Sequence, residues 1–546
     1  MPAGATLAPV IIATDKTQLT QFVGGKSAYP VYLTLGNLPK SVRRKPSKHA
    51  CVLIGYLSVD KISRIGLTAQ EQRARNQRLF HESMRMITAP LLEAGKSGVD
   101  MVGGDGCVHR VHPILASYVA DYTEQCLVSC SKYGTCPKCQ CPVDKLQESQ
   151  HFPSRTQQWT LSVIDDAKKS TATTQQFHKH CMDKDVSGSV HTPFWEGLPH
   201  TDIHLAITPD VLHQLYQGVF KHLVNWCKRT IGLEELDSRI RCLPPSYGLR
   251  HFKNGISALS QISGSERKNM AKILLGCLVG VLPKKAIIAC RSLLDFIYLA
   301  QYTTHDDTTL GYMDEALAIF HQHKSYFIDI GIRQDFNIPK FHSLNHYVES
   351  IRFLGTTDNY NTEMFERLHI DFAKEGWRAS NHRDEFPQMI KWLSRQEKMV
   401  AFQNYITWMD AQKPRPALEA PRTLNLSFTI KLPKHPTRSR QSISVIERQH
   451  SASGFTNSLK DYLNRLMPHP TSSHHAILNT LPFERLDVYH AFKFHPHNLE
   501  DDDEGSHTIV KASPTIGKKP GRYDTVVVLD TDEAESTGLE GAKHTL

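Results

Sequence analysis

The sequence predicts an α/β protein in which a sheet-forming N-terminal part precedes a long all-helical section. Short β-branched runs separated by glycine and asparagine fill about the first sixty residues. From about Thr208 to Ile330 the patterns are helical, with almost no strand signal. Beyond roughly Gln412 the composition shifts to Pro, Ser, Thr and Arg, which predicts a mostly disordered tail.

The N-terminal part is predicted to begin with three consecutive strands and a helix. The strands correspond to the apolar runs at residues 9–13, 29–35 and 50–54, each bounded by turn residues. Thr68 is a plausible N-cap for a helix over residues 69–92, in which apolar residues recur at helical spacing with arginines between them. This helix is expected to pack on the sheet.

Later segments extend this pattern. Residues 126–130 form another short apolar stretch, for which a strand is predicted. The clearest helix of the middle section begins at Thr208 and Pro209, an N-cap followed by a first-turn proline. Its buried stripe is predicted to be Val211, Leu212, Leu215, Tyr216, Val219, Phe220, Leu223 and Val224. A helical return is predicted from His342 to Met399, with core positions Phe365, Leu368, Ile370, Phe372, Met389, Ile390 and Leu393.

Composition sets broad limits on function. The chain has 546 residues, with 64 Lys plus Arg against 55 Asp plus Glu, a balance compatible with a polyanionic partner. The sequence shows neither a signal peptide nor an apolar stretch long enough to span a bilayer, so we expect no membrane association and an intracellular location. The twelve cysteines are unevenly spaced, which argues against a disulfide framework.

Three blocks of sequence resemble Plavaka transposases, a fungal group related to the CACTA transposases. The first block reads ATDKTQLT at residues 13–20, GKSAYPV at 25–31 and GNLP at 36–39. The second runs from LPHTD at 198–202 to TPDVLH at 208–213, and the third reads NTEMFERLH at 361–369. The resemblance covers roughly residues 9–402, and the co-linear order of the blocks makes it more specific than any single motif.

The resemblance implies a ribonuclease-H-like mixed sheet that is interrupted by a large all-α insertion. The implied segments are 1–148 for the first part of the core, 149–335 for the insertion, 336–411 for the helical return, and 412–546 for the tail. It also implies a DDE-type DNA transposase, which performs two-metal-ion phosphodiester cleavage and strand transfer at transposon ends. The alternative is a non-catalytic, element-derived factor that binds DNA or protein.

Such cleavage needs carboxylates that converge on two Mg²⁺ or Mn²⁺ ions. Asp15 directly follows a predicted strand, and the resemblance makes it the first acid, although a turn-capping role is the alternative. Asp121 occupies the place of the second acid, with Asp105 as its rival. Glu366 matches the third acid, and Glu363, three residues earlier on the same helix face, is its alternative.

A second metal site is predicted from two short pairs. Cys136 and Cys139 form a hairpin of the kind that chelates structural zinc, and His342 and His346 lie one helical turn apart. Together they would make a Zn²⁺ site that joins the chain on either side of the insertion. The alternative is free thiols and ordinary helix histidines.

For DNA contacts, Arg43, Arg44 and Lys45 with Lys48 form a basic turn suited to phosphates, or a solvated surface. Asp210-Val-Leu-His213 resembles an acid-x-x-His motif of the wider group, but its amphipathic helix favours a packed or capping role.

The resemblance implies that the partners are transposon ends and target DNA, that the location is the nucleus or otherwise the cytoplasm, and that the chain can form a homo-oligomer. Plavaka transposases usually carry a long N-terminal region, whereas 14 residues precede Asp15 here. We therefore expect an N-terminally truncated copy.

Overall fold

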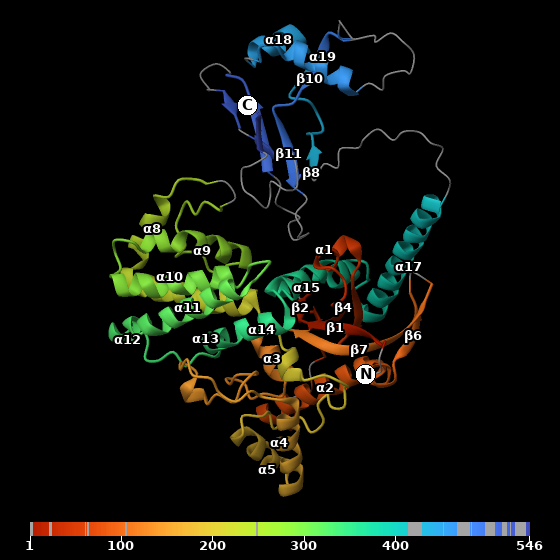
Figure 1. Cartoon of the computed structure of the whole chain (residues 1–546), viewed down its shortest axis with the longest axis vertical. Helices are drawn as coiled ribbons and strands as arrows, with labels where there is room; N and C mark the ends of the chain where they lie inside the picture. Colours follow the sequence, from red (N-terminus) through yellow and green to blue (C-terminus); the bar gives the residue numbers. More distant parts are fainter. Residues whose placement is uncertain are drawn as a thin grey trace. The chain divides into compact units, whose positions relative to one another are not determined.

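The computed structural model describes most of the chain. The described residues are 4–20, 24–60, 62, 65–103, 106–246, 249–412, 428–450, 452–466, 481, 483–496, 508–515, 521–524, 526–529 and 542–545. The chain divides into two compact units, Met1–Ala401 and Phe402–Leu546. The central sheet, the helical insertion and both candidate metal sites belong to the first unit (Figure 1).

A five-stranded mixed sheet lies in the first unit, with strand order β5-β4-β1-β7-β6. The strands are β1 Thr6–Thr14, β4 Pro30–Leu35, β5 Cys51–Tyr56, β6 Val99–Val102 and β7 Val108–Val119. Strands β1 and β7 run parallel, and the other neighbouring pairs run antiparallel. The predicted three-strand meander is confirmed as β1, β4 and β5. A small hairpin of β2 Thr17–Gln18 and β3 Ser27–Ala28 lies between β1 and β4 in the sequence.

Helices cover both faces of this sheet. Ile12 packs in one buried cluster with Phe80 of α2, and its neighbour Ile11 packs in another with Phe365 of α15. Side chains alternate between the two faces of a strand, so consecutive residues of β1 enter different cores. The two helices are α2 Ala69–Ser97 and α15 Thr362–His369. The start predicted for α2 is confirmed, because Thr68 and Glu71 form a reciprocal capping box.

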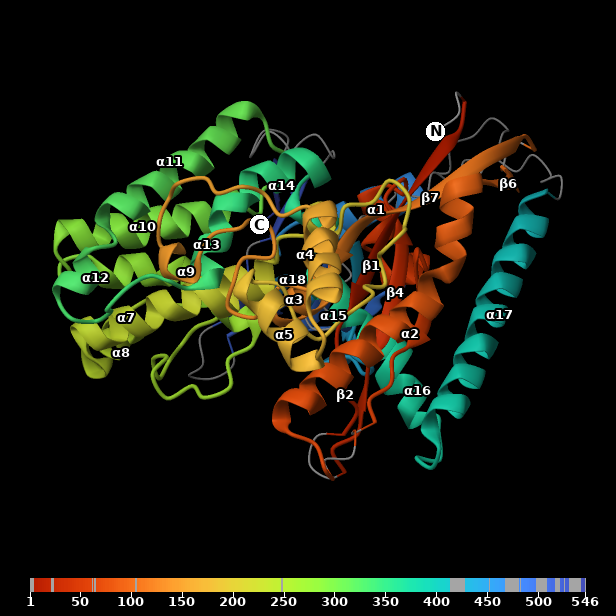
Figure 2. The ribbon, with the colours of Figure 1, turned by 90° about the horizontal axis from the view of Figure 1, so that it is seen from below.

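The middle section is all-helical, as predicted. Figures 1 and 2 show the helices between residues 233 and 329 gathered to one side of the sheet. The helices of the middle section are α4 Gln157–Ser170, α5 Thr174–Asp183, α6 Ile203–Ala206, the π-helix η3 Val211–Phe220, α7 Lys221–Ile231, α8 Leu233–Arg241, α9 Gly264–Leu278, α10 Lys284–Leu299, α11 Asp307–His323 and α12 Tyr326–Asp329. Their largest buried cluster runs from Val211 to Ile351 and so extends beyond residue 335, the expected end of the insertion.

The buried stripe predicted for the helix that begins near Thr208 is confirmed, since all eight of its residues are buried. The predicted N-cap is wrong. The capping side chain is Asp210, which accepts a hydrogen bond from the backbone N–H of His213, whereas Thr208 precedes the helix and bonds to Tyr118. A buried carboxylate is the stronger acceptor for these free N–H groups.

The helical return is broken into short elements. They are α13 Pro339–His342, the 3₁₀ turn η4 Ser343–His346, α14 Tyr347–Leu354, the 3₁₀ turn η5 Thr357–Asn359, α15, the π-helix η6 Ile370–Lys374, α16 Glu375–Arg378 and α17 Glu385–Gln412. Phe365, Leu368, Met389 and Leu393 are buried as predicted, but Ile390 is 52% exposed. Ile390 neighbours a core position on the helix, and periodicity alone places such a flanking residue poorly.

The strand predicted at residues 126–130 is also wrong. This stretch belongs largely to α3, Tyr122–Val128, which begins where the side chain of Asp121 accepts a hydrogen bond from the N–H of Glu124. The last strand before it is β7, which ends at Val119. The cap starts a helix whose apolar face is buried, and this outweighs the β propensity of a short apolar run.

The remaining short elements near the sheet are α1 Lys40–Arg43, the 3₁₀ turn η1 Pro46–Lys48 and the 3₁₀ turn η2 Val143–Lys145. Among the described helices, none combines the length and the apolar character that crossing a bilayer requires.

The second unit contains regular structure where mostly disorder was predicted. Its described elements are β8 Phe428–Lys431, β9 Arg438–Ser442, α18 Ile443–Gln449, α19 Phe455–Leu466, β10 Arg485–Val488, β11 Ala491–Pro496, β12 Thr508–Ser513, β13 Arg522–Tyr523, β14 Val526–Leu529 and β15 Ala542–Thr545. Four of the strands form a sheet in the order β13-β12-β11-β8. Pairing between strands far apart in the sequence leaves little local periodicity, which explains why the sequence did not predict these strands.

Candidate metal centres

Asp15 and Asp121 lie at the same end of two neighbouring parallel strands. Ala13 of β1 pairs with Val119 of β7, and each aspartate follows its paired residue by two positions. Carboxyl ends of adjacent parallel strands meet at one edge of a sheet, where ligands commonly bind. The topology therefore brings together two acids that are 106 positions apart in the sequence.

Glu366 approaches this edge from α15. The pKa of Asp15 is raised to about 7, chiefly by burial and then by the nearby charges of Glu366 and Asp121, against an opposing effect of His213. The three carboxylates therefore share one electrostatic environment. Such crowding of like charges is costly unless a proton or a cation relieves it.

The alternative third acid faces elsewhere. Glu363 pairs with Lys268 of α9 at 2.6 Å and accepts a hydrogen bond from Asn361 at 3.0 Å. The charge of Glu363 is not among the main influences on Asp15. On this geometry Glu366 is the better candidate. Asp105, the rival of Asp121, lies outside the described residues.

A histidine links Glu366 to a buried carboxylate. His213 Nε2 lies 3.2 Å from Glu366 Oε1, and His213 Nδ1 lies 2.9 Å from Asp210 Oδ2. Burial disfavours the charged imidazolium, but the two carboxylates outweigh this and raise the pKa of His213 to about 11. The imidazolium therefore adds one positive charge beside the acidic cluster at neutral pH.

Asp15 and Asp121 open onto a cleft of about 780 Å³ between α2 and α3. Its polar and charged lining includes Lys16, Arg73 and Lys132. Cations and polar side chains beside paired acids suit a phosphate-bearing ligand.

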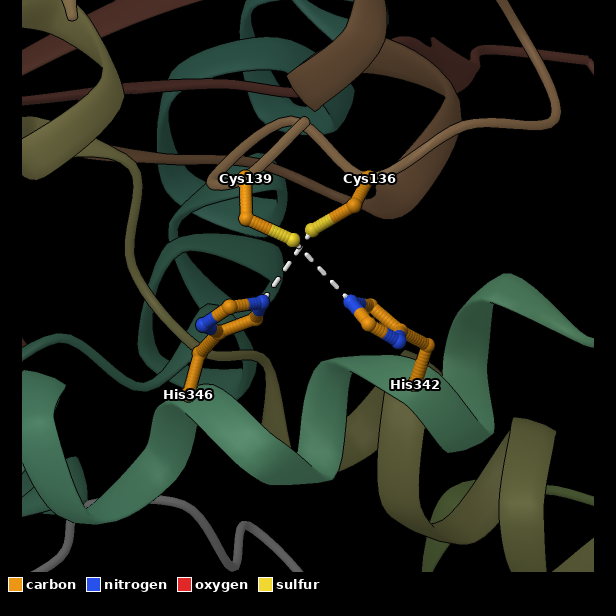
Figure 3. Close-up of side chains that lie close together, drawn as sticks. All are labelled: Cys136, Cys139, His342 and His346. Carbon is orange, nitrogen blue, oxygen red and sulfur yellow. Dashed lines mark hydrogen bonds between the residues drawn. The ribbon is translucent and has the colours of Figure 1, made fainter. Parts of the chain in front are cut away.

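The second candidate centre joins the loop after α3 to α13 and η4. Cys136 Sγ lies 3.3 Å from His346 Nε2, and Cys139 Sγ lies 3.1 Å from His342 Nε2. The four ligand atoms all lie within 4.8 Å of one another. Figure 3 shows the two sulfur atoms and the two ring nitrogens pointing at a common centre. Among the described residues, no other group of three or more His, Cys, Asp or Glu side chains is gathered this closely.

The surroundings hold these four side chains in place. Arg155 Nε donates to the carbonyls of Cys136 and Cys139 at 2.8 and 3.0 Å, which fixes the loop. His342 Nδ1 lies 3.2 Å from the carbonyl oxygen of Leu146, so its Nε2 is left facing the sulfur atoms. Burial alone would raise the pKa of Cys136, but hydrogen bonds from Cys139 and the two histidines hold that pKa well below its ordinary value. A Cys₂His₂ set with a supporting contact behind a histidine ligand fits Zn²⁺.

Residues 1–227 match the family model described as Plavaka transposase. Over this segment the chain is similar to Plavaka transposases. No curated protein matches the chain.

The Plavaka match spans part of each candidate centre. It includes Asp15, Asp121 and the Cys136–Cys139 pair, and it ends before Glu366 and both histidines of the second centre. The match therefore supports the resemblance at the N-terminal half of each site, and the fold supplies the other half.

Part of the basic turn that was expected to contact DNA is instead bound to other residues of the first unit. Arg43 is buried and donates to Leu38 O at 3.0 Å and to Asn359 Oδ1 at 2.9 Å. Arg44 pairs with Asp358 at 3.0 Å. Lys45 is half-buried, and Lys48 is exposed. We therefore drop Arg43 from the expected DNA-contacting set.

The sequence analysis did not identify Glu124, which lines the same cleft as Asp15 and Asp121. The Thr14 hydroxyl donates to the Glu124 carboxyl and also bonds to the Tyr118 hydroxyl at 2.8 Å, which ties the end of β1 to α3. Burial raises the pKa of Glu124 well above its ordinary value. The spacing Asp121-x-x-Glu124, a capping pattern, was the available signal.

Proposed function

We propose that the chain is a DDE-type DNA transposase whose Asp15, Asp121 and Glu366 bind two Mg²⁺ or Mn²⁺ ions. The observation that carries this proposal is the placement of Asp15 and Asp121 at the ends of the parallel pair β1 and β7, with Glu366 close enough to raise the pKa of Asp15. The match of residues 1–227 to Plavaka transposases supports the same assignment.

The chemistry follows from the side chains. Asp15, Asp121 and Glu366 would hold two divalent ions, which would activate water for attack on a phosphodiester and stabilise its leaving oxygen. Asp15, Asp121 and Glu366 offer the hard oxygen ligands that such ions prefer. The cut would free a 3′ hydroxyl at the transposon end, and that hydroxyl would attack target DNA.

A ribonuclease-H-like core is part of the proposal. A three-strand antiparallel meander followed by a strand parallel to the first supports it, as does the helical section between Asp121 and Glu366. Such a core would place the DNA in the cleft beside Asp15, with Lys16 and Arg73 near its phosphates. An enzyme acting on chromosomal DNA would work in the nucleus.

Cys136, Cys139, His342 and His346 would hold a structural Zn²⁺ ion. The first pair follows the second acid in the chain. The second pair is separated from α15 by α14, which has about two turns, and by a loop that contains η5. Zinc at this point would fasten the segment leading to Glu366 onto the segment that follows Asp121. Its role would be to fix the third acid relative to the sheet.

The test is cleavage of DNA carrying the ends of the transposable element that encodes this chain. Wild-type protein with Mn²⁺ should nick this DNA, and Asp15→Asn should bind the same DNA without nicking it. Equal nicking by Asp15→Asn would remove the assignment. DNA binding with no metal-dependent nicking by the wild type would favour the non-catalytic DNA-binding factor instead.

A further inference from the structure

His213 connects the insertion to the third acid through a fully buried carboxylate. The side chain of Asp210 is 0% exposed. Its Oδ1 accepts from the backbone N–H of His213 at 3.0 Å and from the Thr362 hydroxyl at 2.9 Å, and its Oδ2 lies 2.9 Å from His213 Nδ1. Because Asp210 fixes Nδ1 in this way, the imidazole has one orientation, and its Nε2 faces Glu366.

Two pairs of side chains connect the insertion to α15. Thr362 and Glu366 are four residues apart and share a helix face, as do Asp210 and His213 at the start of η3. Thr362 donates a hydrogen bond to Asp210, and Glu366 pairs with His213. Thr362 and Glu366 lie at the two ends of one turn of α15. The insertion therefore determines both the position of that turn and the direction of the Glu366 carboxylate. The π-helical geometry of η3 is of the kind often found at functional sites.

We propose that His213 is a positioning residue that aims Glu366 at the metal ions. The inference rests on the metal-binding role proposed for Glu366. His213 engages Oε1, which leaves Oε2 to bind a cation, and the contact removes the rotational freedom of an otherwise 38% exposed side chain. A partner behind a ligand typically changes metal affinity by about 10- to 100-fold.

A purely structural role for His213 predicts something different. In that case any contact that fastens α15 to the insertion would matter equally. The ion pair between Lys268 of α9 and Glu363 of α15, at 2.6 Å, is such a contact and has no link to Asp15. Lys268→Met is therefore the matched control.

Two isosteric variants separate the two contacts of the imidazole. In His213→Gln the side-chain amide lies near the position of Nε2 and can still donate to Glu366. In His213→Asn the amide lies near the position of Nδ1, so it keeps the bond to the buried Asp210 and loses Glu366. Because the Asn variant retains the buried contact, it should fold even if the Gln variant does not.

The measurement is Mn²⁺ binding to the full chain, followed by the electron paramagnetic resonance signal of free Mn²⁺, beside the Mn²⁺ concentration that gives half-maximal DNA nicking. We expect His213→Asn to lower the Mn²⁺ affinity, and to raise the Mn²⁺ concentration for half-maximal nicking, by about 10- to 100-fold. Nicking by this variant should recover at high Mn²⁺. For His213→Gln and Lys268→Met, both quantities should stay within about threefold of wild type. Wild-type Mn²⁺ affinity in His213→Asn would overturn the inference.

Asp15→Asn separates this inference from the proposed function. If the wild type and Asp15→Asn bind Mn²⁺ alike, the proposed acid site itself is wrong. If Asp15→Asn loses Mn²⁺ and His213→Asn does not, only the positioning role of His213 fails.

Discussion

Asp15 and Asp121 lie two positions after Ala13 and Val119, which pair with each other in the parallel strands β1 and β7. This relationship depends on backbone pairing, so it holds whatever the side-chain rotamers are. The parallel pair forms only because the chain leaves the antiparallel meander and returns through α2 and β6 before β7. The proposed acid site is therefore a consequence of topology.

Replacing each glutamate of α15 tests the choice between them. Glu366→Gln should lower the rate of DNA nicking by more than about 100-fold, because it removes a proposed metal ligand. Glu363→Gln should stay within about tenfold of wild type, since it loses only a partly exposed ion pair with Lys268. Nicking rates at saturating Mn²⁺ provide the comparison, and a reversed order would exchange the two roles.

Acid crowding predicts how stability depends on pH without divalent ions. The pKa of Asp15 is raised to about 7 in the folded protein, so the folded state binds the Asp15 proton more tightly than the unfolded chain does. The stability that this proton contributes is present near pH 4 and is lost as the pH rises through about 7. At pH 8 Asp15→Asn should be more stable than wild type by about 2 kcal/mol, a value reduced for partial solvent screening, and the two should converge near pH 4.

Chemical denaturation of the metal-free protein at several pH values measures this difference. Adding Mn²⁺ at pH 8 should stabilise the wild type and leave Asp15→Asn unchanged. A constant difference between the two proteins across the range would contradict the proposed crowding.

The Cys/His centre predicts one zinc ion per chain. Removing zinc with a chelator, or substituting Cys139→Ser, should lower the free energy of unfolding by at least about 4 kcal/mol, the value for free zinc at a thousand times its dissociation constant. Cys141→Ser is the matched control, because Cys141 is buried in the same loop but is not among the four ligands. Zinc analysis and thermal unfolding test both variants, and loss of zinc from Cys141→Ser alone would refute the ligand set.

The basic turn should separate into a structural part and a DNA-binding part. Arg43→Ala should lower the free energy of unfolding by about 1 to 3 kcal/mol, because it removes a buried side chain that bonds to Leu38 O and to the Asn359 amide oxygen. Lys48→Ala should leave stability unchanged and reduce the slope of log affinity against log salt by about 1. Denaturation curves and a salt titration of DNA binding measure the two effects, and an unchanged salt dependence would remove Lys48 from the interface.

Local signals in the sequence predicted much of the first unit. The strands around Asp15 and the helix that Thr68 begins have strong periodicity and capping, and the Cys136 and His342 pairs have chelating spacing, so these features could be recognised without the fold. The helix that Asp121 caps was misread as a strand because a short apolar run has no clear period.

The features that the sequence did not predict depend on contacts between residues far apart in the chain. No local signal pairs Arg43 with Asn359 or places His213 against Glu366, because the partners are more than 100 residues apart in sequence. The strands of the second unit were missed for a similar reason, since β8 pairs with β11 across a long intervening segment.

Diffraction from crystals of the full chain soaked in Mn²⁺, with anomalous data collected for manganese and zinc, tests the central claim most directly. The account predicts manganese about 2.0 to 2.6 Å from carboxylate oxygens of Asp15, Asp121 and Glu366. It also predicts zinc among Cys136, Cys139, His342 and His346. Manganese bound away from the three acids, with those carboxylates left without a metal at saturating Mn²⁺, would contradict it.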